Sequence, residues 1–242
     1  MRYIYDGKIL EGRIISRPNR FLAEVDLDGQ LVLCHVKNTG RMRELMVKGA
    51  KCYIREVNNP NRKTKYDVIS LVHKGILVNI DSQIPNRVIA DAFENSQIRG
   101  WENPDSLRRE VSVGKSRLDM LVEKDGQKLF VEVKGVDLMK ADFQATFPDA
   151  PTTRGTKHLR ELEDLVKKGN QAMVIFCLHR EDAKDFRPNF KMDPEFFKTF
   201  YEVLQAGVQA RAYTCKVGRD YIELDKEIKI LSKEEAKSEL DQ

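Results

Sequence analysis

Hydrophobic and polar residues alternate along the first third of the chain. Apolar side chains occupy every second position over residues 21–27, and Asp28-Gly29 then predicts a tight turn into a strand over residues 31–36. Further short apolar stretches lie at residues 52–57, 68–72 and 76–80. Because these strands follow one another with no helical period, the region is predicted to form a small β-barrel or β-sandwich.

The period changes after Pro85, where apolar side chains recur at helical spacing until Gly100, which predicts a helix of roughly 14 residues. The near-continuous apolar run over residues 172–178 predicts a strand buried on both faces. The remaining elements are a strand at 108–113, a hairpin centred on Asp125-Gly126, helices ending at Gly169 and spanning 194–206, and a strand at 208–217. This order predicts two domains, a β-barrel over residues 1–82 and a mixed-sheet α/β domain over residues 83–242.

Length and composition agree with a two-domain globular protein. The chain has 242 residues, of which 41% are hydrophobic and 33% are charged. No apolar run is long enough for a membrane span, and the first residues lack the pattern of a secretory signal, so we predict a cytoplasmic protein with no membrane partner. The four cysteines are far apart and without zinc-ligand spacing, which indicates ordinary buried thiols.

The net charge of +4 is unevenly distributed. Residues 1–82 carry 15 Lys and Arg against 9 Asp and Glu, a net charge of +6, and the rest of the chain carries −2. Such asymmetry favours a polyanionic partner such as nucleic acid, although a surplus of this size is also common on ordinary solvated surfaces.

The hairpin around Asp125-Gly126 has a register that can be derived from its turn. If these two residues form the turn, Asp119 lies directly opposite Glu132, and Leu121 lies opposite Phe130. The other face of the hairpin is wholly apolar and is predicted to be core: Leu118, Met120, Val122, Leu129, Val131 and Val133.

Directly opposed residues of a hairpin have Cβ atoms about 5 Å apart. Two carboxylates at this spacing repel each other and destabilise the hairpin unless something neutralises their charge. Oxygen ligands of this kind suit Mg²⁺ or Mn²⁺. Lys134 lies two residues beyond Glu132 on the same face, where its ammonium group is placed to hold a scissile phosphate. The pattern therefore predicts a metal-dependent phosphodiesterase site with Asp119, Glu132 and Lys134 as catalytic residues. The alternative is a solvated strand face on which Arg117 and Lys134 screen the acids.

These residues resemble the PD-(D/E)xK nuclease superfamily, with Asp119 as the aspartate and Glu132-Val133-Lys134 as the (D/E)xK element. Members of that superfamily add an acid from the first core helix, and the resemblance implies Asp91 as a third metal ligand. It also implies Mg²⁺ or Mn²⁺ as the cofactor.

A longer resemblance covers residues 1 to 217 and is to the sugar fermentation stimulation protein A (SfsA) family. It implies an N-terminal oligonucleotide-binding (OB) barrel followed by a nuclease-like domain, in a family described as binding DNA without strong sequence preference and as a regulator of sugar use. The motifs that carry it are Lys37-Asn38-Thr39-Gly40-Arg41-Met42, Asn61-Arg62-Lys63, Pro85-Asn86, Ser116-Arg117-Leu118-Asp119, Val131-Glu132-Val133-Lys134, and the block from Phe147 to Leu159.

Basic residues provide candidate contacts to phosphates. One group lies at the start of the second helix, where free backbone N–H groups attract anions, and the other lies in the barrel, where Tyr53 and Tyr66 are candidate stacking platforms or structural residues. The candidates are Arg154, Lys157 and His158 at the helix, Arg117 on the hairpin, and Arg41, Arg43, Arg62, Lys63 and Lys65 in the barrel.

Two functions follow as hypotheses. The first is a Mg²⁺-dependent nuclease in which the barrel grips the nucleic-acid backbone. The second is a non-catalytic, sequence-nonspecific DNA-binding protein that regulates sugar (maltose) metabolism on a retained nuclease fold. Both require a nucleic-acid partner, for which DNA is favoured over RNA, and both leave a homodimer open.

Overall fold

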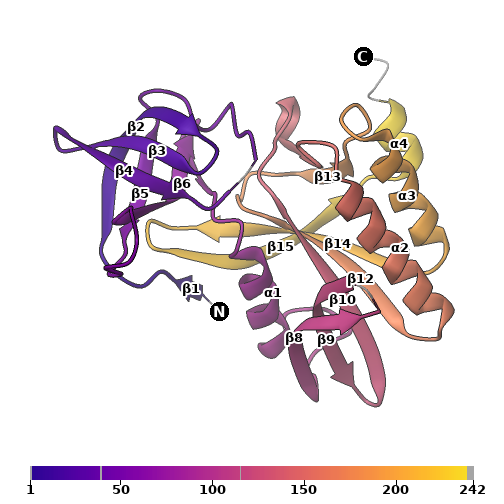
Figure 1. Cartoon of the computed structure of the whole chain (residues 1–242). Coiled ribbons are helices and arrows are strands. Elements are labelled where there is room, and N and C mark those ends of the chain that lie inside the picture. Colours follow the sequence, from indigo (N-terminus) through magenta and orange to yellow (C-terminus); the bar gives the residue numbers. More distant parts are fainter. Residues whose placement is uncertain (1, 39, 115, 239–242) are drawn as a thin grey trace.

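The computed structural model describes residues 2–38, 40–114 and 116–238. Thr39, which belongs to one of the motifs above, lies outside them. Figure 1 shows a barrel, coloured indigo and purple, beside a large twisted sheet with helices on both sides.

Five strands close the barrel. They pair in the order β4-β3-β2-β5-β6, and a parallel pairing between β4 and β6 completes the circle, which makes the domain OB-like. A sixth strand, β7, extends the sheet from β6. The bounds are β2 (Ile9–Asn19), β3 (Leu22–Leu27), β4 (Gln30–Val36), β5 (Lys51–Glu56), β6 (Tyr66–His73) and β7 (Ile76–Asn79).

The large sheet has the strand order β11-β13-β15-β14-β12-β10-β9-β8, and β1 pairs with β15. Its strands are β1 (Arg2–Ile4), β8 (Ser106–Val113), β9 (Ser116–Lys124), β10 (Gln127–Val136), β11 (Gln144–Phe147), β12 (Gln171–Leu178), β13 (Asp185–Pro188), β14 (Gln209–Val217) and β15 (Tyr221–Ile230). The range 1–82 predicted for the barrel therefore includes a strand, β1, that belongs to the other sheet.

Helices cover both faces of the large sheet (Figure 1). The helix α1 (Pro85–Glu94) packs on one face, and α2 (Thr153–Lys167) and α3 (Pro194–Gln205) pack on the other. A short η1 (Ala141–Phe143) precedes β11, and α4 (Lys233–Ser238) follows β15. Among the residues that the structure describes, no helix combines the length and apolar character needed to cross a bilayer.

The strand β12 is buried on both faces, as its continuous apolar run predicts. Met173 and Ile175 lie in the cluster that includes α1, and Val174 and Phe176 lie in the cluster that includes α2 and α3. The four cysteines are buried free thiols.

Several elements differ from the sequence expectation, which lacks the strands β1, β2, β11, β13 and β15. The helix α1 ends at Glu94, short of Gly100, because Ser96 takes a left-handed conformation with φ of 58°. The strand β15 is absent from the predicted elements, although Ile222, Leu224, Ile228 and Ile230 alternate along it. The charged residues between these apolar positions make the alternation hard to recognise in the sequence.

The barrel packs against the α1 face of the large domain. Tyr53 and Ile69 of the barrel share a hydrophobic cluster with Val88 and Phe93 of α1. At the end of β7, the Asn79 N–H donates to the carbonyl of His179 at 2.9 Å. These contacts place the barrel beside the ends of β10 and β12.

Candidate active site

The hairpin of β9 and β10 has the register that its turn predicts, from Gln127–Lys124 to Val131–Met120. The ladder ends there, because β10 continues beside β12 while β9 stays with β8. Asp119 and Glu132 are therefore not a ladder pair, contrary to the expectation from the sequence. Instead, they face the fork at which β9 and β10 diverge.

Asp119 fills this fork with its carboxylate. Oδ2 accepts a hydrogen bond from the backbone N–H of Val133 at 2.7 Å, in place of a missing ladder bond. Oδ1 accepts one from the side-chain amide of Asn86, in the first turn of α1, at 2.6 Å. Both oxygens keep a second lone pair for a further partner.

Glu132 is 3% exposed and has two partners on the same oxygen. Its Oε1 accepts from the Lys134 ammonium at 2.5 Å and from His158 Nδ1. Its Oε2 is buried and has no hydrogen-bond partner among the described residues. Burying a carboxylate oxygen without a hydrogen-bond partner costs free energy. Glu132 Oε2 is therefore a candidate contact for a bound ligand.

The two carboxylates have opposite pKa shifts. Burial raises the pKa of Asp119, and the nearby charge of Glu132 raises it further. Burial would also raise the pKa of Glu132, but the hydrogen bond from His158 and the charge of Lys134 lower it below its ordinary value. The negative charges of Asp119 and Glu132 therefore repel each other. Of the two, Glu132 is the one in direct contact with a lysine and an imidazole.

The start of α2 positions His158. Thr152 caps the helix by accepting the Gly155 N–H at 3.0 Å, and Asp193 accepts the N–H of Thr152 at 2.7 Å. His158 then lies on the buried stripe of the helix with Leu162 and Leu165, facing the sheet. Arg154 Nε lies 3.4 Å from His158 Nε2, on the opposite side of the ring from Glu132.

The donor set fits a divalent cation held by two carboxylates and water. Mg²⁺ keeps several waters and needs only one or two protein carboxylates. Glu132 Oε2 and the free lone pairs of Asp119 supply such a site, although the described residues contain no group of three or more His, Cys, Asp or Glu side chains that could hold a metal.

Asp91, the third metal ligand implied by the resemblance, lies on α1. It lies five residues after Asn86 on α1, which is about 140° around the helix and about 7.5 Å along it. Its role as a third metal ligand stays a prediction, and the contact that α1 makes with Asp119 comes from Asn86.

The predicted barrel cations lie in different environments. Arg62 is bound to the fully buried Asp67 at 2.5 Å, so its role in the fold competes with any role in binding. Lys63 and Lys65 are exposed on the loop between β5 and β6, and Arg41 and Arg43 are exposed on the loop between β4 and β5. Tyr53 is buried and Tyr66 is half-buried, which favours structural roles.

Three predicted cations lie in one surface depression beside His158, which contacts Glu132. Arg117, Arg154 and Lys157 line one surface depression with His158. Arg117 pairs with Glu110 and is 64% exposed, and Lys157 lies 3.6 Å from Glu161 and is 58% exposed. Both remain accessible to a polyanion.

Sequence reasoning missed two contacts of the site, those of Asn86 and His158. Asn86 lies 33 residues from Asp119, and His158 lies 26 residues from Glu132. One signal was available for the histidine, because its spacing from Leu162 and Leu165 puts it on the buried stripe of α2. For Asn86, no periodic pattern in the sequence indicated a contact with Asp119.

Comparisons with known proteins agree along the whole chain. A family model described as the sugar fermentation stimulation protein RE domain matches residues 83–221, and one described as the SfsA N-terminal OB domain matches residues 15–80. A sugar fermentation stimulation protein homolog of Alkaliphilus metalliredigens is 46% identical, with 95% of this chain and 100% of that protein covered. A homolog of Clostridium tetani is 42% identical, with 94% and 99% covered. The structure of Pyrococcus furiosus SfsA in complex with Ca²⁺ is similar with a TM-score of 0.87 and 28% identity, covering 96% of this chain and 100% of that one.

Proposed function

This chain belongs to the sugar fermentation stimulation protein (SfsA) family, and from that premise we propose that it binds nucleic acid and hydrolyses phosphodiester bonds with Mg²⁺ or Mn²⁺. One observation carries the proposal. At the fork of β9 and β10, the half-buried carboxylate of Asp119 and the buried carboxylate of Glu132 lie beside a lysine, and one oxygen of Glu132 is buried without a partner among the described residues.

Asp119 and Glu132 would hold the metal ion, which when bound activates a water molecule and neutralises charge on the phosphate. Asn86 and the Val133 N–H hold Asp119 in place. His158 holds Glu132 Oε1, which leaves Oε2 directed away from that contact. Lys134 would donate to a phosphate oxygen of the bound strand. The Ca²⁺ named with the P. furiosus relative supports this proposal, because Ca²⁺ also selects oxygen ligands.

The second candidate is a non-catalytic DNA-binding protein that acts in the regulation of sugar metabolism. It is favoured by one feature of the site: Lys134 and His158 contact Glu132 Oε1 without a metal ion. The names of the relatives also refer to sugar fermentation.

The deciding experiment is a cleavage assay on single- and double-stranded DNA and RNA with Mg²⁺ or Mn²⁺. We expect Asp119→Asn and Lys134→Ala each to lower the cleavage rate at least about 100-fold. Glu227→Gln is a matched control, because Glu227-Ile-Lys229 repeats the Glu-x-Lys spacing on β15, where Glu227 pairs with Arg99 at 3.6 Å. Binding without cleavage by the wild type under every condition would favour the regulator.

The barrel's part in binding is tested separately through salt dependence. Lys63→Ala combined with Lys65→Ala should reduce the log–log slope of affinity against salt by about 0.9 for each phosphate of duplex DNA that the variant no longer neutralises. Arg62 is left intact, because its loss would remove one of the cationic partners of the buried Asp67. Lys167→Ala with Lys198→Ala, at two lysines that are 61% and 63% exposed on α2 and α3, should leave the slope unchanged. An equal change in both variants would remove this loop from the interface.

A further inference from the structure

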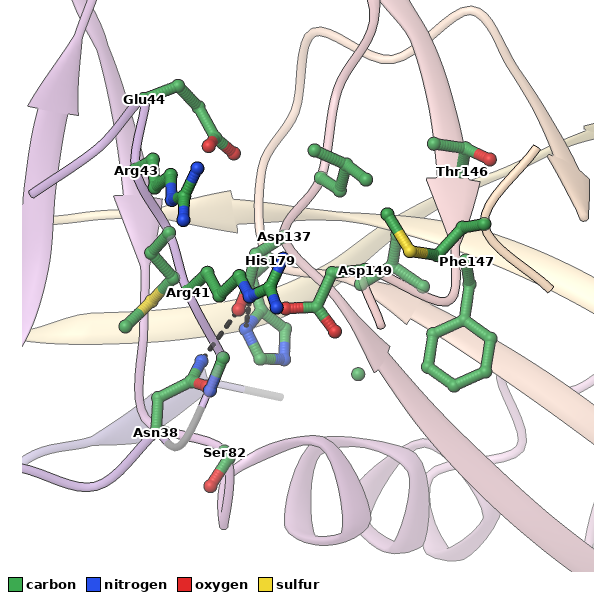
Figure 2. Close-up of a pocket in the computed structure, with 16 residues that line it drawn as sticks. Asn38, Arg41, Arg43, Glu44, Ser82, Asp137, Thr146, Phe147, Asp149 and His179 are labelled. Atoms are coloured by element: carbon green, nitrogen blue, oxygen red, sulfur yellow. Dashed lines mark hydrogen bonds and ion pairs between the residues drawn. The ribbon is translucent and has the colours of Figure 1, made fainter. Parts of the chain in front are cut away.

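A second cavity lies where the barrel meets the ends of β10 and β12, and it has a volume of about 410 Å³. The barrel contributes the loop that carries Asn38 and Arg41, and the large domain contributes Asp137, Phe147 and His179 (Figure 2). Because β10 and β12 are parallel, the cavity lies at their carboxyl ends, the edge at which open α/β sheets bind ligands. Neither domain forms it alone.

Polar contacts between the domains build the floor of this cavity. Asn38 Nδ2 donates to Asp137 Oδ2 at 2.7 Å, and His179 Nδ1 lies 2.6 Å from Asp137 Oδ1 (Figure 2). Burial would lower the pKa of His179, but Asp137 raises it to about 9. His179 is therefore protonated at neutral pH, and its contact with Asp137 helps to tie the barrel loop to the ends of both strands.

Arg17 holds the barrel loop at the mouth of the cavity through backbone hydrogen bonds. Arg17 donates to the backbone carbonyls of Asn38, Gly40 and Arg41 at 2.7 to 3.0 Å. Gly40 has no side chain, and a Cβ there would lie 2.9 Å from Asp149 Oδ2. The lack of a side chain lets the loop approach the large domain closely and fixes the direction of the arginines that follow.

Two cations at the mouth have no bound partner. Arg41 and Arg43 are exposed, and their guanidinium groups make no hydrogen bond or ion pair within the described ranges. Arg41 extends toward Asp149 in Figure 2. A second depression, lined also by Arg17 and Arg20, shares both arginines and continues from the cavity over the barrel. This provides a basic path from the barrel surface into the junction.

The interior of the cavity is apolar as well as charged. Met42, Phe147 and Met192 line it together with Val136 and Leu138. Two carboxylates, Glu44 and Asp149, lie beside the arginines and disfavour a bare anion. The combination suits a ligand with a flat apolar ring that carries amino donors and with a phosphate for the arginines, which is the chemistry of a nucleotide.

We propose that this cavity is a subsite for one nucleotide of a bound nucleic-acid strand, with its base among Met42, Phe147 and Met192 and its phosphate on Arg41 and Arg43. Gly135, which lines the cavity, directly follows Lys134, and Asp137 lies about 10 Å beyond Lys134 along β10. A strand crossing from the barrel to the carboxylates passes this point. The inference rests on the proposed function for the identity of the strand.

Methionine methyl signals provide a direct test in the full-length protein. With [ε-¹³C]methionine labelling, deoxynucleoside 5′-monophosphates should shift the signals of Met42 and Met192 in a saturable manner. Met120 and Met173 are fully buried in the sheet core and serve as internal controls whose signals should stay in place. Absence of any shift at Met42 and Met192, or an equal response to inorganic phosphate, would overturn the subsite.

Variants locate the bound nucleotide. Arg41→Ala with Arg43→Ala should weaken its binding about 10-fold or more, since charge-assisted hydrogen bonds are lost. Arg108→Ala with Arg109→Ala, on the edge strand β8, is the matched control and should leave the affinity unchanged. Asp119→Asn should also leave it unchanged, and loss of the Met42 response in that variant would place the nucleotide in the carboxylate site instead.

The same readout separates this inference from the nuclease proposal. A single-stranded oligonucleotide added to the Asp119→Asn protein should shift the same two methyl signals without any cleavage. Shifts by mononucleotides but not by the oligonucleotide would overturn the strand subsite. Shifts by both, with no cleavage by the wild type, would retain the subsite and reject the nuclease.

Discussion

Both domains bury a carboxylate against cations, but the two sites are built differently. In the barrel, Asp67 contacts Arg62 at 2.5 Å, Arg55 at 2.9 Å and Lys37 at 3.1 Å, and both of its oxygens are used. In the large domain, Glu132 shares one oxygen between Lys134 and His158, has no partner for the other among the described residues, and lies near a second carboxylate. The cations around Asp67 outnumber its charge and use both oxygens, which is typical of a structural site. Glu132 keeps an oxygen that can bind a ligand.

The pKa shifts express the same contrast. Burial would raise the pKa of Asp67, but the hydrogen bonds and charges of Arg62 and Lys37 lower it to about 2. For Asp119, burial and the charge of Glu132 dominate, and the pKa is raised. Ionised Asp67 therefore stabilises the fold at neutral pH, and ionised Asp119 does not.

The largest effect on stability is expected from Asp67→Asn. The substitution leaves Arg55, Arg62 and Lys37 without their shared anion, and we expect the free energy of unfolding to fall by about 4 kcal/mol. Urea denaturation measures it. Glu11→Gln, which removes an exposed acid paired with Lys51, should cost much less, because solvent screens an exposed ion pair. Similar losses in the two variants would remove the distinction between a structural and a surface acid.

Glu132→Gln should lower Mg²⁺ affinity at least about 100-fold, equivalent to about 3 kcal/mol, because it removes the charge of the oxygen that has no partner in the described part of the chain. Isothermal titration calorimetry measures the affinity, and circular dichroism verifies the fold. Glu227→Gln is the control. Wild-type affinity in the Glu132 variant would exclude this carboxylate as a metal ligand.

Acid should weaken the barrel through Asp67. Its pKa is lower in the folded state, about 2, than the ordinary 3.8, so the stabilisation is present above about pH 4 and is lost as the pH falls toward 2. The expected loss is about 2 kcal/mol. It is measured as the difference in unfolding free energy between wild type and Asp67→Asn at pH 5 and at pH 2.5. A difference that does not change with pH contradicts the lowered pKa.

The smallest effect on stability is expected from Asp119→Asn. The amide keeps an acceptor for the Val133 N–H and removes the repulsion by Glu132, so the free energy of unfolding should change by less than about 1 kcal/mol or increase. The same urea titration measures it. A decrease comparable with that of Asp67→Asn would make Asp119 a structural residue.

Periodicity determined much of the fold in advance. The alternating strands of the barrel, the helical stripes of α2 and α3 and the continuous apolar run of β12 all depend on local spacing. The register of the β9–β10 hairpin followed from its two-residue turn, as far as Met120 and Val131. The pairing of β1 with β15 had no such signal, because the two strands are some 220 residues apart.

The sequence by itself thus determined most of the barrel strands, the helices α2 and α3, the buried strand β12 and the hairpin that carries Asp119, Glu132 and Lys134. The reason is that backbone period and turn geometry act over a few residues. Only the tertiary structure decided that β9 and β10 diverge, that Asn86 contacts Asp119, and that His158 contacts Glu132. It also decided that Arg62 pairs with Asp67. These outcomes depend on how helices pack on a sheet and on which buried charges find partners, and both are properties of the folded whole.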